Sequence, residues 1–392
     1  YKVYQISDYL IGSDNIEADF IIIVRFEDQG EFPSGVLASA MPILIENYSK
    51  RPIVGVLTIS QNVNFFGYDK STEYFSLVFM HELTHALGFL DGMFNYFPGG
   101  RSSTILQKDQ RNYIITEKVV KKAKEYFNCN TLLGVELEDQ GGSGSSISHW
   151  EQRYLLGDYM GAIIYQEEMA ISDFTLALLE DSGWYKANYY TGGLFRFGKH
   201  KGCDFLNLDC LDQDLNSRFK NEFFNFDDNM SPSCSSGRQS RTYSIVTKYQ
   251  SLDNSIYKGI QKNGEIYGGV YYTANYCLVH ARNYLEGYFS YFEGNCQWGN
   301  GNYGNYIYYF NGNIPEQFHP NSEIPNNYGE KYGKNSFCAM SSLIPNNEKT
   351  KIYNSIFHPM CYPHYCSNKS LTIQINDQYI VCPRSGGTFN VK

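Results

Sequence analysis

The chain has 392 residues, enough for two or three domains with a substantial core. Its net charge of −9 and pI near 5.4 provide no basic stripe to neutralise phosphates, which argues against nucleic acid as the main partner. The longest apolar runs, such as residues 21–24, are far too short to span a bilayer. We therefore expect membrane association only through segments outside this sequence.

Three segments with strand character come first along the chain. Residues 18–26 and 52–60 are β-branched runs bounded by turn residues, which is typical of buried strands. Residues 35–41, between them, predict a shorter strand at an edge of the sheet. Because a helical pattern follows, the sequence predicts a mixed sheet with a helix packed on it.

The next segment is the most informative of the chain. Apolar residues recur at helical spacing through residues 71–80 and lead into the motif HELTHALGF, which starts at His81. On a helix, His81 and His85 lie one turn apart on one face, close enough to bind one ion. Glu82 leaves the helix about 100° from His81, where it can act as a general base without ligating the metal. Gly88 can adopt a positive φ and end the helix. The alternative is a buried helix whose histidines are only satisfied by hydrogen bonds.

The middle of the chain alternates between irregular and helical patterns. His149 and Trp150 follow directly after its Gly/Ser-rich part. The expected elements are an irregular stretch at 97–103, a helix at 115–127, a loop at 136–148 and a helix at 171–184.

Ten cysteines are present, and none lies in the first 128 residues. No pair has the C-x-x-C spacing of a structural zinc site, so five disulfides formed in an oxidising compartment are favoured over free thiols. Beyond about Asp209 the chain turns to short strands and turns. Residues 284–336, rich in Tyr, Asn and Gly, predict an irregular loop of a disulfide domain rather than a stacking platform for bases or sugars.

A catalytic zinc takes three protein ligands and keeps one position for water, and two residues are candidates for the third ligand. Asp91 lies three residues after Gly88, where compact peptidases with an H-E-x-x-H-x-x-G-x-x-H motif have a ligand. The rival is His149, which is followed eleven residues later by Met160 in a Gly-Asp-Tyr-Met-Gly turn that can form an apolar floor. Near His149, we expect Glu151 to be an exposed charge, with an orienting partner of that histidine as the alternative.

Around His149 the chain resembles the leishmanolysin family of metzincin metallopeptidases. In that family a long insertion separates the third histidine from the HExxHxxGF block, and a Met-turn follows at about this spacing. The resemblance implies that the zinc ligands are His81, His85 and His149, that Glu82 is the base and that Met160 is structural. The similar segments are residues 18–26, 51–60, 126–153 and 201–210, and more loosely 337–342 and 379–383.

The implied fold is of the α+β class. It combines a metzincin-type zincin catalytic domain, with a mixed twisted sheet and the active-site helix, a helical and loop central subdomain, and a disulfide-rich C-terminal domain that is mostly β or irregular. The expected divisions are residues 1–90, whose usual beginning is largely missing, 91–208, which carry the third ligand and the Met-turn, and 209–392. The implied disulfides are Cys129–Cys203, Cys210–Cys277, Cys234–Cys338 and Cys296–Cys361, which leave Cys366 with Cys382.

Together these features predict a zinc-dependent endopeptidase, secreted or at the cell surface, that hydrolyses polypeptides with one Zn²⁺ as its cofactor. The ion would activate water for attack, with Glu82 as general base. Residues 35–38 are the candidate strand along which an extended substrate would lie, with a buried strand as the alternative. A pro-segment or a surface-assembly partner is a possible partner that could keep the site closed. The alternative is a protein that keeps the peptidase fold without using catalysis, as an adhesion or structural component of a surface assembly.

Overall fold

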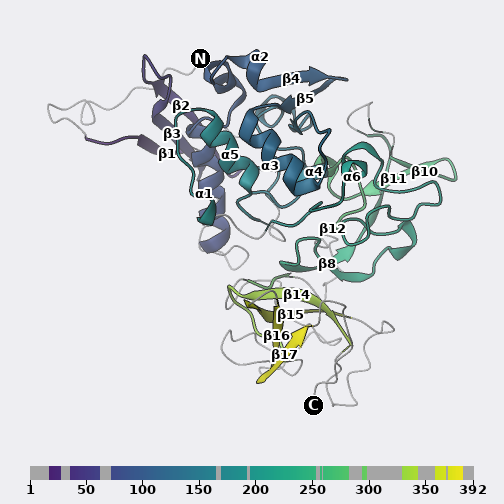
Figure 1. Cartoon of the computed structure of the whole chain (residues 1–392). Coiled ribbons are helices and arrows are strands. Elements are labelled where there is room, and N and C mark those ends of the chain that lie inside the picture. The colour runs from purple at the N-terminus through teal and green to yellow at the C-terminus, as the bar shows by residue number, and fades with distance from the viewer. Residues whose placement is uncertain are drawn as a thin grey trace.

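A computed structural model gives the conformation of most of the chain (Figure 1). Small sheets and mostly short helices follow one another from the N-terminal sheet to the four-stranded sheet β14–β17, which lies at the far end of the molecule. The described residues are 17–27, 36–61, 72–164, 169–191, 195–252, 257, 259–281, 294–297, 329–342, 358–367 and 370–382.

The first sheet has three strands, β1 (Ile21–Glu27), β2 (Ala38–Ile45) and β3 (Pro52–Ser60). Their order is β1-β3-β2, with β1 parallel and β2 antiparallel to β3, so the prediction of a mixed sheet is confirmed. The second strand begins three residues later than expected, and Gly35 lies outside the described residues. Since β2 pairs only with β3 in the described part of the chain, it is an edge strand.

The long helix α1 (Thr72–Ala86) packs on this sheet and carries the histidine motif. Val78 and Ala86 are buried against side chains of β2 and β3. The approach is close, because a Cβ added at Gly55 of β3 would lie 3.0 Å from the Cβ of Ala86. Gly88 has a φ of 127°, a conformation that L side chains rarely adopt, and this confirms its expected role just after the helix.

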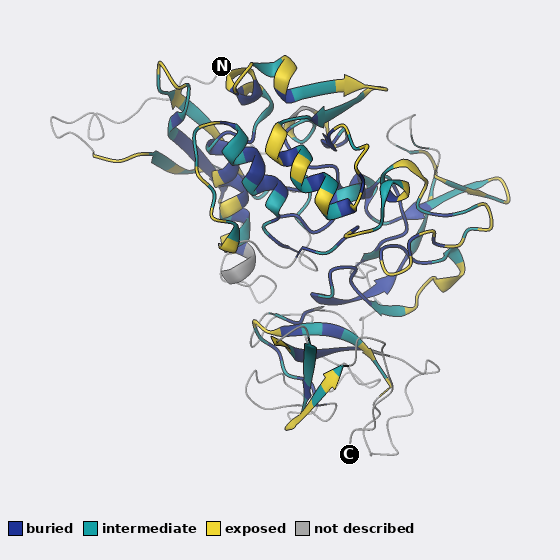
Figure 2. Ribbon diagram, viewed as in Figure 1, coloured by how far each residue is buried: buried dark blue, intermediate teal, exposed yellow. Residues whose placement is uncertain are grey.

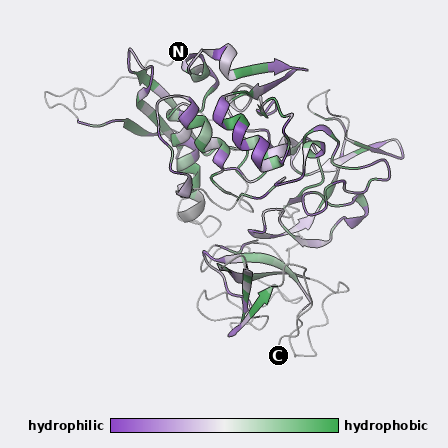
Figure 3. Ribbon diagram, viewed as in Figure 1, coloured by the Kyte–Doolittle hydropathy of each residue, from purple (hydrophilic) through white to green (hydrophobic). Residues whose placement is uncertain are grey.

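The central region surrounds two packed helices, α3 (Glu117–Phe127) and α5 (Asp173–Asp181). The two predicted helices are thus confirmed with shorter bounds. Buried and exposed residues alternate along α3, and its outer surface is hydrophilic (Figures 2 and 3). The other elements are η2 (Asp91–Tyr96), α2 (Arg101–Thr104), β4 (Ile105–Lys108), β5 (Arg111–Ile114), β6 (Val135–Glu136), η3 (Gly142–Gly144), α4 (Gln152–Leu155), η4 (Tyr189–Thr191) and α6 (Cys203–Asn207).

The last part of the described chain is built from short strands, as predicted. Strands β7, β8, β12 and β13 form one sheet, β9 to β11 a second, and β14 to β17 a third. The bounds are η5 (Phe226–Asp228), β7 (Pro232–Cys234), β8 (Ser240–Ser244), β9 (Val246–Tyr249), β10 (Ile260–Lys262), β11 (Glu265–Gly269), η6 (Tyr272–Ala274), β12 (His280–Ala281), β13 (Gly294–Asn295), β14 (Ser336–Ser341), β15 (His358–Ser367), β16 (Ser370–Ile375) and β17 (Gln378–Cys382).

Four of the five expected disulfides are present: Cys129–Cys203, Cys210–Cys277, Cys234–Cys338 and Cys296–Cys361. The fifth pairing was wrong, because Cys366 and Cys382 are free. Both cysteines stand opposite Leu371 of β16, one from β15 and the other from β17. Two strand spacings, about 9.6 Å, separate them, which is more than the 4.4–6.8 Å that a disulfide spans between Cα atoms.

The largest hydrophobic core is aromatic and runs across the middle of the chain. It joins Phe89 and Trp150 to Phe205, and it continues through Phe223 to Ala281. The core therefore includes residues on both sides of position 208, and the division of the chain at 90 and 208 stays a prediction.

Two expectations concern membranes and the Tyr/Asn/Gly-rich segment. Among the described residues, no helix combines the length and the apolar character needed to cross a bilayer. Most of residues 284–336 lie outside the described part of the chain, so the expected irregular loop there is untested.

Candidate metal centre

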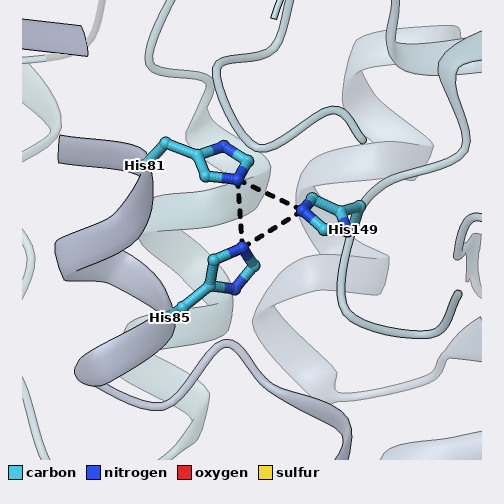
Figure 4. Close-up of side chains that lie close together, drawn as sticks. All are labelled: His81, His85 and His149. Atoms are coloured by element: carbon cyan, nitrogen blue, oxygen red, sulfur yellow. Dashed lines mark hydrogen bonds between the residues drawn. The ribbon is translucent and has the colours of Figure 1, made fainter. Parts of the chain in front are cut away.

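Three histidine side chains meet where α1 faces the loop before α4. His81 and His85 come from neighbouring turns of α1, and their Nε2 atoms are 3.0 Å apart. His149 reaches them from the far end of the Gly/Ser-rich loop, with its Nε2 3.1 Å from both. Figure 4 shows the three rings turned toward one another, with the three Nε2 atoms at the corners of a triangle. The expected trio is therefore brought together.

The other ring nitrogen of each histidine is held by a backbone carbonyl. Because a carbonyl oxygen can only accept, each Nδ1 carries the proton and each Nε2 presents a lone pair. Such outer contacts orient histidine ligands in metal sites. The acceptors for His81, His85 and His149 are, in that order, the carbonyl oxygens of Tyr159 (2.6 Å), Phe89 (2.7 Å) and Ser145 (2.7 Å).

Burial keeps the three rings neutral. It lowers the pKa of His85 to about 4 and that of His149 to about 3, and it lowers the pKa of His81 well below its ordinary value. Repulsion among neighbouring imidazoles adds to the effect on His81 and His149. At neutral pH all three Nε2 lone pairs are therefore free to bind a metal ion.

The histidine cluster fits a zinc ion. Three acceptor nitrogens packed without a proton between them repel one another unless a cation lies among them. Two nitrogen ligands at about 2.0–2.1 Å from a tetrahedral zinc ion lie about 3.3 Å apart, close to the separations of 3.0 and 3.1 Å found here. With three ligands, one coordination position stays open, as in catalytic zinc sites.

Asp91, the rival for third ligand, lies outside this cluster. Its side chain is 45% exposed and pairs with Arg101 at 2.6 Å. Its backbone N–H donates to the hydroxyl of Ser148, next to His149. Asp91 therefore stabilises the loop that carries His149, through its backbone, and does not face the three imidazoles.

Glu82 lies between the histidines and the edge strand. Its carboxylate accepts a hydrogen bond from the backbone N–H of Ala40 on β2, and its side chain is buried. Burial outweighs this hydrogen bond and raises the pKa of Glu82 to about 8. In the metal-free chain the carboxyl group therefore holds a proton at neutral pH, whereas a nearby cation favours the ionised form.

Met160 is fully buried, in a turn held by a carboxylate. Asp158 stabilises the turn, because its Oδ1 accepts the Met160 N–H at 2.7 Å, a contact typical of short acidic side chains in turns. The Thr175 hydroxyl of α5 donates to the same carboxylate, and the Met160 carbonyl accepts the backbone N–H of Trp150 at 3.0 Å. The turn is thus fixed to α5 and to the residue after His149.

Tyr159 is a site residue that sequence reasoning missed. Its carbonyl orients His81, and its hydroxyl lies 2.8 Å from the hydroxyl of Thr84 on α1. Tyr159, the residue before Met160, therefore joins the turn to α1 through two contacts, one with His81 and one with Thr84. A backbone acceptor has no residue-type signal, so the sequence offered no indication of this contact.

The expected exposure of Glu151 was wrong. Its side chain is fully buried, and its Oε1 accepts the backbone N–H of Arg153 at 2.9 Å. Burial, followed by repulsion from Glu138 and Glu136, raises the pKa of Glu151. No described hydrogen bond joins it to the imidazole of His149, so it does not orient that ring directly.

We expect the metal-free chain to lose stability as the pH rises from about 6.5 to about 8. Burial raises the pKa of Glu136 to about 7 and those of Glu82 and Glu138 to about 8, so the folded state binds more protons than the unfolded state in this window. The depressed pKa values of His85 and His149 act in the opposite direction only below about 6.5. Urea unfolding with chelator present at pH 6.5 and 8.0 measures the effect, and equal or greater stability at pH 8.0 would contradict it.

Comparison with known proteins agrees with the site. A model of the leishmanolysin family matches residues 5–391. The leishmanolysin-like peptidase of Caenorhabditis briggsae is 25% identical over 439 residues, which cover 93% of this chain and 60% of that protein. Its counterpart in Drosophila melanogaster is 43% identical over 99 residues, 25% of this chain and 14% of the relative. The leishmanolysin of Leishmania chagasi is 32% identical over 202 residues, 50% of this chain and 32% of the relative.

The matched stretches thus span between 14% and 60% of the length of these three relatives. The family model, in contrast, extends over nearly the whole of this chain, including both helical turns of the motif and the loop that carries His149. The chain belongs to the leishmanolysin family of peptidases.

Proposed function

We propose that this chain is a zinc-dependent endopeptidase that hydrolyses peptide bonds in proteins. The observation that carries the proposal is the convergence of three neutral imidazoles, with Nε2 atoms 3.0–3.1 Å apart, beside a buried glutamate on the same helix. Membership of a peptidase family supports the same reaction.

Each residue has a defined role in this proposal. His81, His85 and His149 hold Zn²⁺ through Nε2. A zinc ion bound there supplies Lewis acidity, which activates water and polarises the scissile carbonyl. Glu82 accepts the proton of the attacking water and passes it to the leaving amine. Met160 is structural, and the turn around it holds His81 through the Tyr159 carbonyl.

The substrate is proposed to bind along β2. This strand has one unpaired edge in the described structure, and Ala40 on it contacts the Glu82 carboxylate. An extended peptide that adds to such an edge gains main-chain hydrogen bonds and places its backbone beside the general base. The proposed binding segment is centred on Ala40, two residues beyond the expected 35–38.

Removal of the metal tests the zinc requirement. A zinc chelator is expected to abolish cleavage of an unfolded protein substrate, and one equivalent of Zn²⁺ per chain is expected to restore it, since the three imidazoles form a single site. The assay follows peptide release and zinc content in parallel, with addition of Mg²⁺ as the control. Full activity in protein shown to be free of zinc would refute the proposal.

We also propose that the protein acts outside the cell or at its surface. Four disulfides support this location, because such bonds persist in oxidising compartments. A pro-segment or a surface-assembly partner that covers the site is compatible with it. If the zinc-loaded chain cleaves no protein substrate, the alternative of an adhesion or structural component that keeps a peptidase fold is favoured.

A further inference from the structure

A second group of possible metal ligands lies at the base of the loop that carries His149. Glu138, Asp139 and Glu151 each place one carboxylate oxygen within 4.8 Å of the others. Glu138 and Glu151 are fully buried, and Asp139 is half-buried. The cluster contains no histidine and uses none of the residues of the zinc site.

The buried carboxylates are only half satisfied. Oε1 of Glu138 accepts the N–H of Gln140, and Oε1 of Glu151 accepts the N–H of Arg153, both at 2.9 Å. The second oxygen of each, Oε2, is buried and has no hydrogen-bond partner. The amide oxygen of Gln140 is likewise buried without a partner. Unpaired buried oxygens are costly, and those on charged groups most of all.

No protein cation in the described structure forms a direct ion pair with the group, although the charge of Arg153 acts on Glu151 at longer range. Among the described residues, no lysine or arginine forms an ion pair with Glu138, Asp139 or Glu151 within 4.0 Å. The two nearby arginines are engaged elsewhere. Arg111 pairs with Glu136 at 2.9 Å. Arg153 donates to the carbonyl of Phe205 in α6 and to that of Leu208 just after it, and its guanidinium lies over aromatic rings.

We propose that Glu138, Asp139 and Glu151 bind one Ca²⁺ ion. Sites made only of oxygen ligands favour hard cations. Calcium ligands lie about 2.3–2.6 Å from the ion, so oxygens up to about 4.8 Å apart can share it, whereas Mg²⁺, at about 2.0–2.1 Å, requires closer ligands. The Tyr257 hydroxyl donates to both oxygens of Asp139, at 2.7 and 2.8 Å, and each oxygen keeps a further lone pair for an ion. Water would supply the remaining ligands of the six to eight positions.

The calcium ion would hold together the base of the His149 loop. The backbone N–H of Glu138 donates to the His149 carbonyl at 2.9 Å, and that of Glu151 donates to the Glu136 carbonyl at 3.1 Å. The carboxylates thus sit on the two chain segments where the loop begins and ends. Ionised without a cation, the carboxylates would repel one another across these two segments, and a cation between them would reverse that force.

Calorimetric titration of CaCl₂ into the full chain, loaded with zinc and free of calcium, tests the proposal. We expect about one Ca²⁺ per chain, with a Kd of about 10⁻⁴–10⁻³ M, the range of extracellular calcium modules. The Glu138→Gln and Glu151→Gln variants should bind at least tenfold more weakly, and so should the milder Asp139→Asn. The matched control is Glu125→Gln on the exposed side of α3, which should bind like the wild type.

The absence of Ca²⁺ binding by the zinc-loaded wild type would overturn the proposal and would mean that protons neutralise the carboxyl groups. Binding that Asp139→Asn leaves unchanged would also overturn it, because the ion would then lie elsewhere. If the glutamine variants do not fold, the wild type and Asp139→Asn still decide. Zinc content, measured in the same samples, separates these outcomes from a failure of the proposed peptidase function.

Discussion

Replacing Glu82 with glutamine is expected to reduce proteolysis by about 10²–10⁴-fold while zinc binding stays intact. This is the contribution that a positioned general base makes. Glutamine has the same shape, and its amide oxygen can still accept the N–H of Ala40, so the position of the side chain is preserved. Because the three imidazoles do not depend on Glu82, the variant should hold one zinc per chain. Initial rates on an unfolded protein substrate, together with metal analysis, measure both effects.

The control for this variant is Glu125→Gln, an exposed glutamate on α3, which should keep full activity. A Glu82→Gln enzyme that retains wild-type activity would show that another group takes the proton. Loss of zinc together with activity would mean instead that Glu82 supports the ligands. The two readouts thus separate a chemical role from a structural one.

The second large effect is expected for the third ligand. The His149→Ala variant should bind zinc more than about 100-fold more weakly, since the loss of outer contacts to ligands alone costs 10–100-fold. Asp91→Ala should keep its zinc. It removes a half-exposed ion pair with Arg101, and such pairs contribute at most about 1 kcal/mol. Competition with a colorimetric zinc chelator measures the affinities of both variants.

His200→Ala, at an exposed histidine, is the matched control for the loss of an imidazole and should bind zinc like the wild type. If the Asp91 variant loses zinc and the His149 variant keeps it, the assignment is reversed. Circular dichroism of the zinc-free forms checks that the His149 variant still folds.

The sequence predicted the parts of the site that depend on local spacing. His81, Glu82 and His85 follow from the helical period, and the apolar residues around them predict the buried face of α1. Spacing alone could not favour His149 over Asp91. His149 meets His81 and His85 only through the fold, since more than 60 residues separate it from each of them in the sequence. Only the resemblance to a family selected it.

Other features left no trace in the residue types. The carbonyl groups that orient the histidines belong to the backbone, which every residue has. Glu151 seemed a surface charge because its burial depends on how the loop packs, not on its neighbours in sequence. The predicted pairing of Cys366 with Cys382 was wrong for a similar reason. Strand β16 lies between the two cysteines and keeps them too far apart, and the number and spacing of cysteines in the sequence do not show this separation.

The aromatic core also determines where the catalytic part can be cut. Phe205 packs against Phe219 and Phe223, with ring centroids 5.2 and 6.0 Å away, and the Arg153 guanidinium lies 4.6 Å from the Phe223 ring. A fragment that stops at residue 208 would uncover these surfaces directly behind the segment after His149. The shortest fragment that can fold around the site therefore extends to about Ala281, where this core ends. In an expression screen or a partial digest, residues 209–281 of the cysteine-rich region would then behave as part of the catalytic core and not as a separable domain.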